Sequence, residues 1–190
     1  MFKYINQINE EAFLLDFGSK IDIEINTTVN LFAKIILNSP KKIQALKITN
    51  IVPSYNKILI RFDPSIKKKN KIIDYLKSIK ISQKKNNEKS KIIEIPVCYD
   101  DKYAIDLNYI SKITNLNKNE IIDLHTNTLF HVYMIGFLPG LPFMGNIDKI
   151  ANLPRKLTPR INIPKGSIGI VENLCVIYPQ NSPGGWNIIG

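Results

Sequence analysis

The sequence predicts an α+β protein made of two small units whose backbones behave differently. Its 190 residues fit one large or two small domains, and 44% of them are apolar, which is sufficient to build hydrophobic cores. Eight of the nine glycines and seven of the eleven prolines lie within residues 136–190. We therefore expect alternating strands and helices in the first half of the chain, and short strands between tight turns in the second.

Residues 1–81 are predicted to form a ββαββα plait, because apolar residues alternate in four short stretches and recur at helical spacing in two others. The first predicted helix has an apolar face that includes Val29, Phe32 and Ile36. It is expected to end at Ser39-Pro40, because the residue before a proline disfavours helix. The predicted strands are Lys3–Ile8, Ala12–Phe17, Gln44–Val52 and Lys57–Phe62, and the second helix contains Ile72, Ile73, Leu76 and Ile79.

The net charge of +10 is concentrated in one short segment of the chain. The eight basic and six acidic residues of 1–63 give +2, the ten and two of 64–91 give +8, and the eight and eight of 92–190 cancel. We interpret the basic segment as the second helix followed by a polar linker at 82–91, with its lysines in solvent. Only Tyr75 interleaves with these lysines, so nucleic acid is not an expected partner.

The N-terminal residues carry acids where a signal peptide needs a continuous apolar region, and no apolar run reaches the roughly 18–20 residues that span a bilayer. We expect a cytoplasmic protein with no membrane partner.

Cys98 and Cys175 lack the spacing of a zinc site and have no local histidine partner. Two buried free thiols and no bound metal are therefore expected.

Residues 92–190 are predicted to form a compact β barrel or sandwich with two short helices near its start. Asn117 followed by Glu120 is similar to a capping box and marks the start of the second helix. The predicted elements are a strand at Ile92–Tyr99, helices at Asp106–Thr114 and Lys118–Thr126, an apolar strand within Leu129–Phe137, and strands around Asn162–Ile163, Ser167–Val171, Cys175–Tyr178 and Trp186–Ile189.

Three Gly/Pro clusters stand out in this half: residues 136–145, 154–160 and 178–186. Proline fixes φ and glycine tolerates unusual φ, so such loops let backbone N–H groups approach a ligand closely and can cradle an anion. Ordinary corners of a barrel have the same composition, so both interpretations stay open at this point.

The clusters belong to three ordered blocks. They are H-x(10)-GF-x-PG-x-P-x-x-G at residues 125–145, PR-x(3)-PR-x(3)-P-x-GS at 154–167, and YP-x(3)-PGGW-x-x-IG at 178–190. With these blocks the chain resembles the family of bacterial 5-oxoprolinase B subunits, also called allophanate hydrolase subunit 1 or KipI-like proteins. The resemblance covers nearly the whole chain and implies an N-terminal α+β domain and a C-terminal cyclophilin-like β-barrel domain.

The resemblance also implies a function. Such a protein is one subunit of an ATP-dependent hydrolase that opens 5-oxoproline to glutamate together with A and C subunits, with ATP as co-substrate and Mg²⁺ expected beside it. A related branch is similar to an inhibitor of a sensor histidine kinase, so a protein-binding regulator is the alternative. Relatives usually continue past the position of Gly190. The β domain is therefore expected to be truncated at its C-terminus, and an inactive truncated relative is a further alternative.

Phosphoryl transfer to a lactam oxygen needs charge neutralisation and positioning. Arg155 and Arg160 are predicted catalytic residues because a guanidinium matches phosphate or carboxylate bidentately; structural salt bridges are the alternative. His125 is the third predicted catalytic residue, because it lies near an expected helix C-terminus whose dipole favours the protonated imidazole. A structural, hydrogen-bonded histidine is the alternative. The predicted substrate- or nucleotide-binding residues are Gly136, Phe137, Pro139, Gly140, Lys165, Gly166, Ser167, Tyr178, Pro183, Gly184, Gly185 and Trp186.

Overall fold

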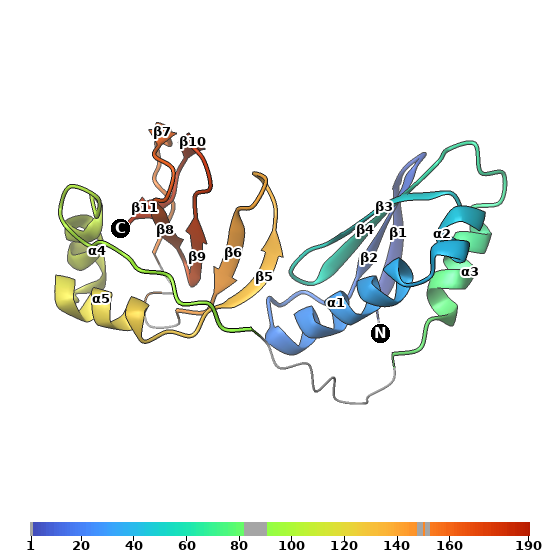
Figure 1. Ribbon diagram of the computed structural model, residues 1–190, viewed down its shortest axis with the longest axis horizontal. Helices are drawn as coiled ribbons and strands as arrows, with labels where there is room; N and C mark the ends of the chain where they lie inside the picture. Colours follow the sequence, from blue (N-terminus) through green and yellow to red (C-terminus); the bar gives the residue numbers. More distant parts are fainter. Residues whose placement is uncertain (1, 82–90, 148–149, 151–152) are drawn as a thin grey trace. The chain divides into compact units, whose positions relative to one another are not determined.

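A computed structural model describes residues 2–81, 91–147, 150 and 153–190, and divides the chain into two compact units, 1–89 and 90–190 (Figure 1). The predicted linker, residues 82–91, lies outside the described residues except for Lys91. The hydrophobic clusters do not cross between the units, so each unit has a core of its own.

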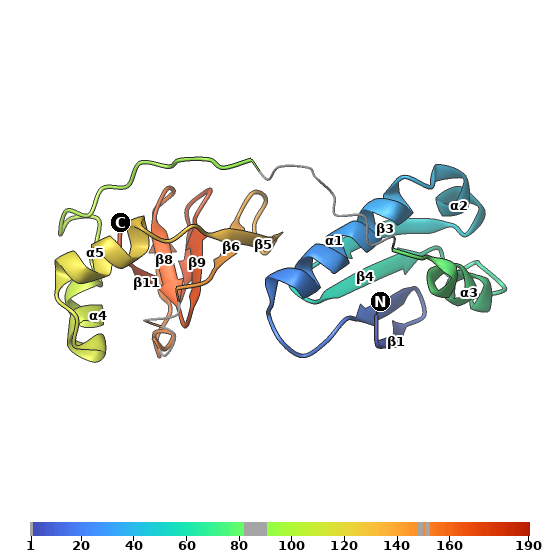
Figure 2. The ribbon, with the colours of Figure 1, turned by 90° about the horizontal axis from the view of Figure 1, so that it is seen from below.

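The N-terminal unit packs its helices against one face of a four-stranded antiparallel sheet of order β1-β2-β4-β3 (Figure 2). Alternate residues of the two central strands are buried, among them Leu15, Ile58 and Ile60. This period of two places one face of the sheet in the core. The elements are β1 (Tyr4–Asn9), β2 (Ala12–Asp16), α1 (Ile23–Leu37), α2 (Pro40–Ala45), β3 (Ile48–Pro53), β4 (Lys57–Phe62) and α3 (Asn70–Ser78).

Helix α1 begins and packs as its sequence dictates. The Asp22 carboxylate accepts hydrogen bonds from the N–H groups of Glu24 and Ile25 at 2.9 and 3.0 Å, which satisfies two donors that the first turn leaves free. Val29, Phe32 and Ile36 are completely buried at the spacing of one helical face. The helix is thus fixed at its start by a polar cap and along its length by the sheet.

Helix α2 is the element that the predicted ββαββα order lacks. The first helix does end before Ser39-Pro40, but proline suits the first turn of a helix because that turn needs no N–H donor. Pro40 therefore starts α2 after the turn at Ser39. The prediction of a strand from Gln44 is wrong, since Gln44 lies in α2 and β3 begins at Ile48.

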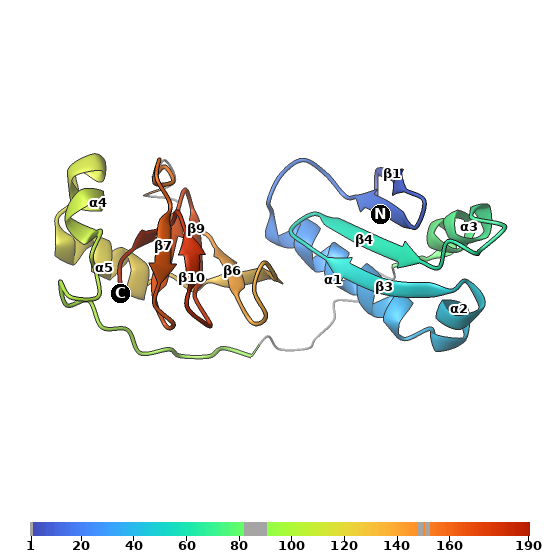
Figure 3. The same cartoon turned by 90° about the horizontal axis from the view of Figure 1, so that it is seen from above.

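The C-terminal unit has a five-stranded antiparallel sheet of order β11-β8-β9-β6-β5 (Figure 1) and a separate two-stranded ribbon of β7 and β10 (Figure 3). The pairings among the described residues leave this sheet open, with β5 and β11 at its edges, so they do not close the expected barrel. Its elements are α4 (Leu107–Thr114), α5 (Lys118–Thr126), β5 (His131–Ile135), β6 (Pro142–Gly145), β7 (Arg160–Ile163), β8 (Ile168–Val171), β9 (Leu174–Ile177), β10 (Ser182–Gly184) and β11 (Asn187–Ile188).

Both faces of this sheet are covered. Ile170 and Cys175 pack with residues of α4 and α5, whereas their neighbours Val171 and Val176 pack with Tyr178 and other residues outside the helices. Helix α5 starts with the predicted capping box, in which the Glu120 N–H donates to the Asn117 side chain at 3.0 Å and the reciprocal bond is 2.7 Å. None of the described helices is long and apolar enough to cross a membrane.

Two kinds of strand prediction fail in this unit. The segment Ile92–Tyr99, an expected strand, is mostly exposed and forms no strand; Pro96 within it lacks the N–H that a ladder needs. Cys98 is accordingly exposed rather than buried, while Cys175 is buried. Conversely, β6 and β10 lie inside Gly/Pro clusters whose composition predicts turns.

Replacing Ile60 by alanine is expected to lower the free energy of unfolding of the N-terminal unit by about 2–5 kcal/mol, because it removes a completely buried side chain from the central strand β4. Urea unfolding followed by far-UV circular dichroism measures the change. Ile8→Ala is the matched control, since Ile8 lies in the same sheet but is 54% exposed, and it is expected to change stability by less than about 0.5 kcal/mol. Equal losses for the two variants contradict the placement of the core.

Candidate functional site

The first and second Gly/Pro clusters of the sequence both contact the third, residues 178–186. From the second cluster, the Lys156 N–H donates to the Gly185 carbonyl oxygen at 2.8 Å. The Gly166 N–H donates to the Tyr178 carbonyl oxygen at 2.7 Å. Gly184 packs so closely that a Cβ atom there would lie 2.5 Å from the Tyr178 hydroxyl, which explains the need for glycine. A Cβ atom on Gly140, in the first cluster, would lie 3.8 Å from Pro179. Turns that are far apart in sequence therefore surround one buried tyrosine.

Arg155 extends this cluster to the surface. Its guanidinium carbon lies 5.8 Å from the centroid of the Trp186 ring, within the range of a cation–π contact. Trp186 is buried and contacts Phe143 edge to face, with 5.8 Å between ring centroids. Arg155 is exposed, and none of the ion pairs formed by the described residues includes it. Its positive charge is thus held over an aromatic ring but left available to an anion.

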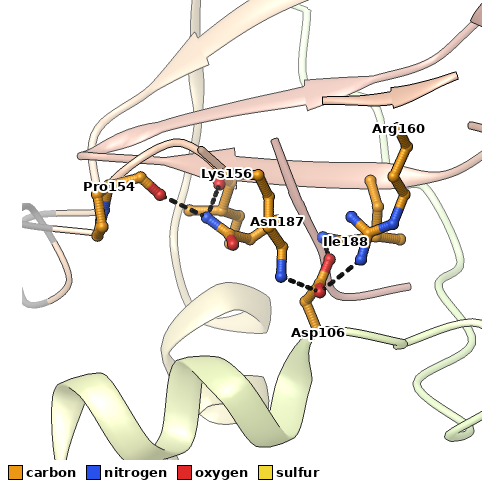
Figure 4. Close-up of polar contacts among 7 residues, drawn as sticks. Asp106, Pro154, Lys156, Arg160, Asn187 and Ile188 are labelled. Carbon is orange, nitrogen blue, oxygen red and sulfur yellow. Dashed lines mark hydrogen bonds and ion pairs between the residues drawn. The ribbon is translucent and has the colours of Figure 1, made fainter. Parts of the chain in front are cut away.

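Asp106 pairs with Lys156 and Arg160, the other two cations of this region (Figure 4). It occupies the position before the first residue of α4, and its side chain is only 4% exposed. Its Oδ1 atom lies 2.6 Å from Lys156 Nζ and accepts a hydrogen bond from Arg160 Nη2 at 2.7 Å. Its Oδ2 atom accepts the Ile188 N–H at 2.7 Å, and its own N–H donates to the Ile188 carbonyl at 2.9 Å. One carboxylate therefore connects α4, β7, β11 and the loop before β7.

The charges of this region are unbalanced. Burial alone would raise the pKa of Asp106, but the hydrogen bonds from Arg160, Lys156 and the Ile188 backbone hold that pKa below its usual value. Asp106 is therefore ionised at neutral pH. Lys156 and Arg160 contact this carboxylate, and Arg155 and Arg160 both act on Tyr178, so three cations and one carboxylate give the region a local formal charge of +2 that suits an anionic ligand.

Three buried polar atoms beside this cluster have no hydrogen-bond partner among the described residues. They are Arg160 Nη1, Ser182 Oγ and Asn187 Oδ1. Arg160 uses only its other terminal nitrogen on Asp106, and Asn187 uses its amide nitrogen on the carbonyls of Pro154 and Ile170. An unpaired buried polar group costs about 1–3 kcal/mol, so a ligand or water that satisfies such groups binds favourably. Arg160 thus retains a free donor in the same turn-lined region as Arg155.

Tyr178 lies within the field of both arginines. Burial raises the pKa of its hydroxyl, and the charges of Arg155 and Arg160 oppose that rise. The tyrosine is therefore neutral at physiological pH. The predicted site residues Arg155, Arg160, Tyr178, Gly184, Gly185 and Trp186 are thus brought into one region of the C-terminal unit.

His125 belongs to a different cluster. It is buried between Tyr99, whose hydroxyl lies 2.6 Å from Nδ1, and Cys175, whose sulfur lies 3.6 Å from Nε2. Phe130 packs on its ring. The expectation of a protonated imidazole is wrong: burial lowers the pKa of His125 to about 4, which outweighs the helix dipole. Burial also raises the pKa of Cys175 to about 12, so this thiol is no thiolate nucleophile at neutral pH.

The first cluster presents an unusual aromatic residue. Phe137 has a φ of +67°, which bulky residues rarely adopt, and its side chain is 74% exposed. The neighbouring turn is closed by a hydrogen bond from the Gly136 N–H to the Leu141 carbonyl at 3.1 Å. The remaining predicted binding residues on exposed or half-buried turns are Pro139, Gly140, Lys165, Gly166 and Ser167, whereas Pro183 is an exposed residue of strand β10.

Sequence reasoning missed Asp106, Lys156, Ser182 and Asn187. Asp106 was visible only as the first residue of a predicted helix, where aspartate is common as a cap. Its partner Arg160 is 54 residues further along the chain. Since no local pattern or spacing links two such distant positions, only the fold can pair them.

The described residues contain no group of three or more His, Cys, Asp or Glu side chains that could hold a metal ion. The carboxylate that pairs with Arg160, Asp106, is already occupied by two cations and a backbone donor. The site residues present do not fit the Mg²⁺ expected with ATP, and we assign no step to it in this chain.

A mixed α/β fold with antiparallel sheets and a basic, turn-lined region characterises this chain, and the chain belongs to the family described as carboxyltransferase domain, subdomain C and D, whose sequence model matches residues 3–190. It is 33% identical over 200 residues to the B subunit of 5-oxoprolinase from Bacillus subtilis, covering 98% of this chain and 80% of that protein. It is 28% identical over 183 residues to the B subunit of 5-oxoprolinase from Haemophilus influenzae, covering 96% of this chain and 83% of that protein. These relatives confirm the resemblance noted in the sequence.

Solved structures agree with the fold. The crystal structure of TTHA0988 superposes with a TM-score of 0.80 at 30% sequence identity and covers 94% of this chain. This chain spans only 34% of the TTHA0988 chain. The two proteins therefore share this part of their fold, and TTHA0988 carries further sequence besides.

The stability of the C-terminal unit is expected to fall as the pH drops from about 6.5 to about 4. His125 has a lower pKa when folded than the ordinary value of 6.5, so the unfolded chain binds the proton first and is favoured on acidification. The expected loss is about 3 kcal/mol once both pKa values are passed. Urea unfolding followed by the fluorescence of Trp186, the one tryptophan of the chain, measures this unit alone.

The matched variants for this test are His125→Gln and His131→Gln. The first is expected to flatten the pH dependence between pH 6.5 and 4, and the second to leave most of it, since His131 is only half-buried. A pH dependence that survives in His125→Gln means that another group produces it.

Proposed function

We propose that this chain is the B subunit of a 5-oxoprolinase, acting with A-like and C-like subunits to open 5-oxoproline to glutamate at the expense of ATP. The family membership and the two curated relatives support this assignment. The observation that supports a ligand-binding role most directly is the pair of arginines in the turn-lined region, with an exposed guanidinium on Arg155 over Trp186 and an unpartnered Nη1 on Arg160.

The chemistry explains why such a site is useful. An amide is stabilised by resonance, so its oxygen is first phosphorylated: the γ-phosphoryl group of ATP moves to the lactam oxygen and ADP leaves. Water then adds at the carbonyl carbon, the carbon–nitrogen bond breaks, and a second water releases phosphate from the resulting acyl phosphate. Every intermediate is anionic, and the catalytic demand is for positioned positive charge.

In this proposal Arg155 and Arg160 bind the phosphoryl or carboxylate group of the reactants. Lys165, Gly166 and Ser167 line the turn that is hydrogen-bonded to Tyr178, and Gly184 lets the Tyr178 ring pack against the Gly184 backbone. His125 serves the fold, because both of its ring nitrogens face protein groups and its imidazole is neutral.

A protein-binding regulator is the second candidate, and one surface favours it. Leu157 and Ile161, on either side of Arg160 in sequence, are 103% and 92% exposed. Large apolar side chains that stand in solvent beside cations suit a protein partner. The partner in this case is a sensor histidine kinase. A kinase whose autophosphorylation rate is unchanged by saturating protein removes this candidate.

The enzyme assignment is tested by mixing the full chain with the A-like and C-like subunits of the same organism, 5-oxoproline and ATP, and measuring glutamate release. Turnover that requires this chain supports the proposal. Turnover that proceeds equally well without this chain contradicts the proposal. So does a lack of turnover with this chain under conditions where the B subunit of a characterised relative restores activity.

Within that assay, Arg155→Met is expected to reduce turnover at least about tenfold, because a hydrogen bond to a charged group contributes about 1.5–3 kcal/mol. Arg61→Met is the matched control, since Arg61 is also an exposed arginine but pairs with Glu11 at 2.6 Å in the N-terminal unit. The control is expected to retain the wild-type rate. An Arg155→Met enzyme that is as active as the control excludes Arg155 from the site.

A further inference from the structure

Asp106 has more contacts than a helix cap requires. Capping asks for a side-chain acceptor for the first-turn N–H groups, but the Asp106 side chain makes no such bond. Both of its oxygens are used elsewhere, on Lys156, Arg160 and the backbone of Ile188. The residue therefore performs a task other than starting α4.

The geometry at Arg160 indicates that task. A guanidinium is planar, so fixing one terminal nitrogen fixes the direction of the other. Asp106 Oδ1 holds Nη2 at 2.7 Å, and Nη1 is buried with no partner among the described residues. Lys156 supports the same oxygen, because its Nζ lies 2.6 Å from Oδ1 and 4.2 Å from the centroid of the Tyr109 ring. The carboxylate is thus itself held in place while it holds the arginine.

We propose that Asp106 is the positioning residue of the anion site: it orients the Arg160 guanidinium so that Nη1 is left to donate to an oxyanion of the ligand. The inference rests on the proposed function of the arginines. In this role a negatively charged residue favours the binding of a negatively charged ligand. Their direct Coulomb interaction alone would oppose that binding.

The opposed signs make the proposal testable. If Asp106 acts only through its charge, Asp106→Asn removes a repulsion and tightens anion binding. If Asp106 positions Arg160, the same variant weakens binding although the site becomes more positive. Arg160→Lys gives a second test that keeps the charge: a lysine has one nitrogen and cannot bind Asp106 and a ligand through two separate atoms.

The experiment measures binding of inorganic pyrophosphate to the full chain by isothermal titration calorimetry, at a temperature well below each variant's unfolding midpoint as followed by Trp186 fluorescence. Asp106→Asn and Arg160→Lys are each expected to raise Kd about tenfold, the effect of losing one charge-assisted hydrogen bond. The matched control is Asp16→Asn, which removes the carboxylate that pairs with Lys57 at 2.7 Å in the N-terminal unit, and it is expected to leave Kd unchanged.

The outcomes separate the positioning role from the proposed function. The positioning role is overturned if the wild-type protein binds pyrophosphate and Asp106→Asn binds it equally or more tightly. That result leaves the anion site in place. If Asp106→Asn does not fold, an unchanged Kd for Arg160→Lys overturns the positioning role instead. Wild-type protein that does not bind pyrophosphate removes the anion site itself, and the positioning role with it.

Discussion

The C-terminal unit depends on one buried carboxylate. Burying a charge costs several kcal/mol unless partners compensate for it, and Asp106 is compensated by two cations and a backbone donor from three different parts of the chain. Because each partner belongs to another element, the requirement to satisfy this charge fixes where α4, β7, β11 and the loop before β7 lie. The same requirement sets the direction of Arg160, so folding and the candidate site share one constraint.

Local patterns were sufficient for much of the fold. The capping box at Asn117 and Glu120 and the apolar face of α1 are decided by neighbouring residues, and the structure agrees with both. The failures arise where composition is ambiguous. Pro40 follows the end of one helix and starts another, and β6 and β10 are hard to recognise in segments rich in proline and glycine because these strands are only three or four residues long.

The candidate site was predictable in its residue types but not in its pairings. Arg155 and Arg160 stood out because they are two of only three arginines among the 26 basic residues, and the turns that carry the predicted residues do meet around Tyr178 and Trp186. The prediction of a protonated His125 failed, since the helix dipole can be inferred from sequence whereas burial cannot. The role of Asp106 could not be inferred from the sequence, because the charges that pair with it come from distant positions.

The unequal surroundings of the two cysteines give the chain a built-in chemical reporter. Cys98 stands in solvent on the unpaired segment before α4, whereas Cys175 lies in the core beside His125 with a strongly raised pKa. A thiol reagent should modify one sulfur in the native protein and reach the other only when the sheet separates from α5. The rate of that second modification then measures how often this core opens, without any engineered label.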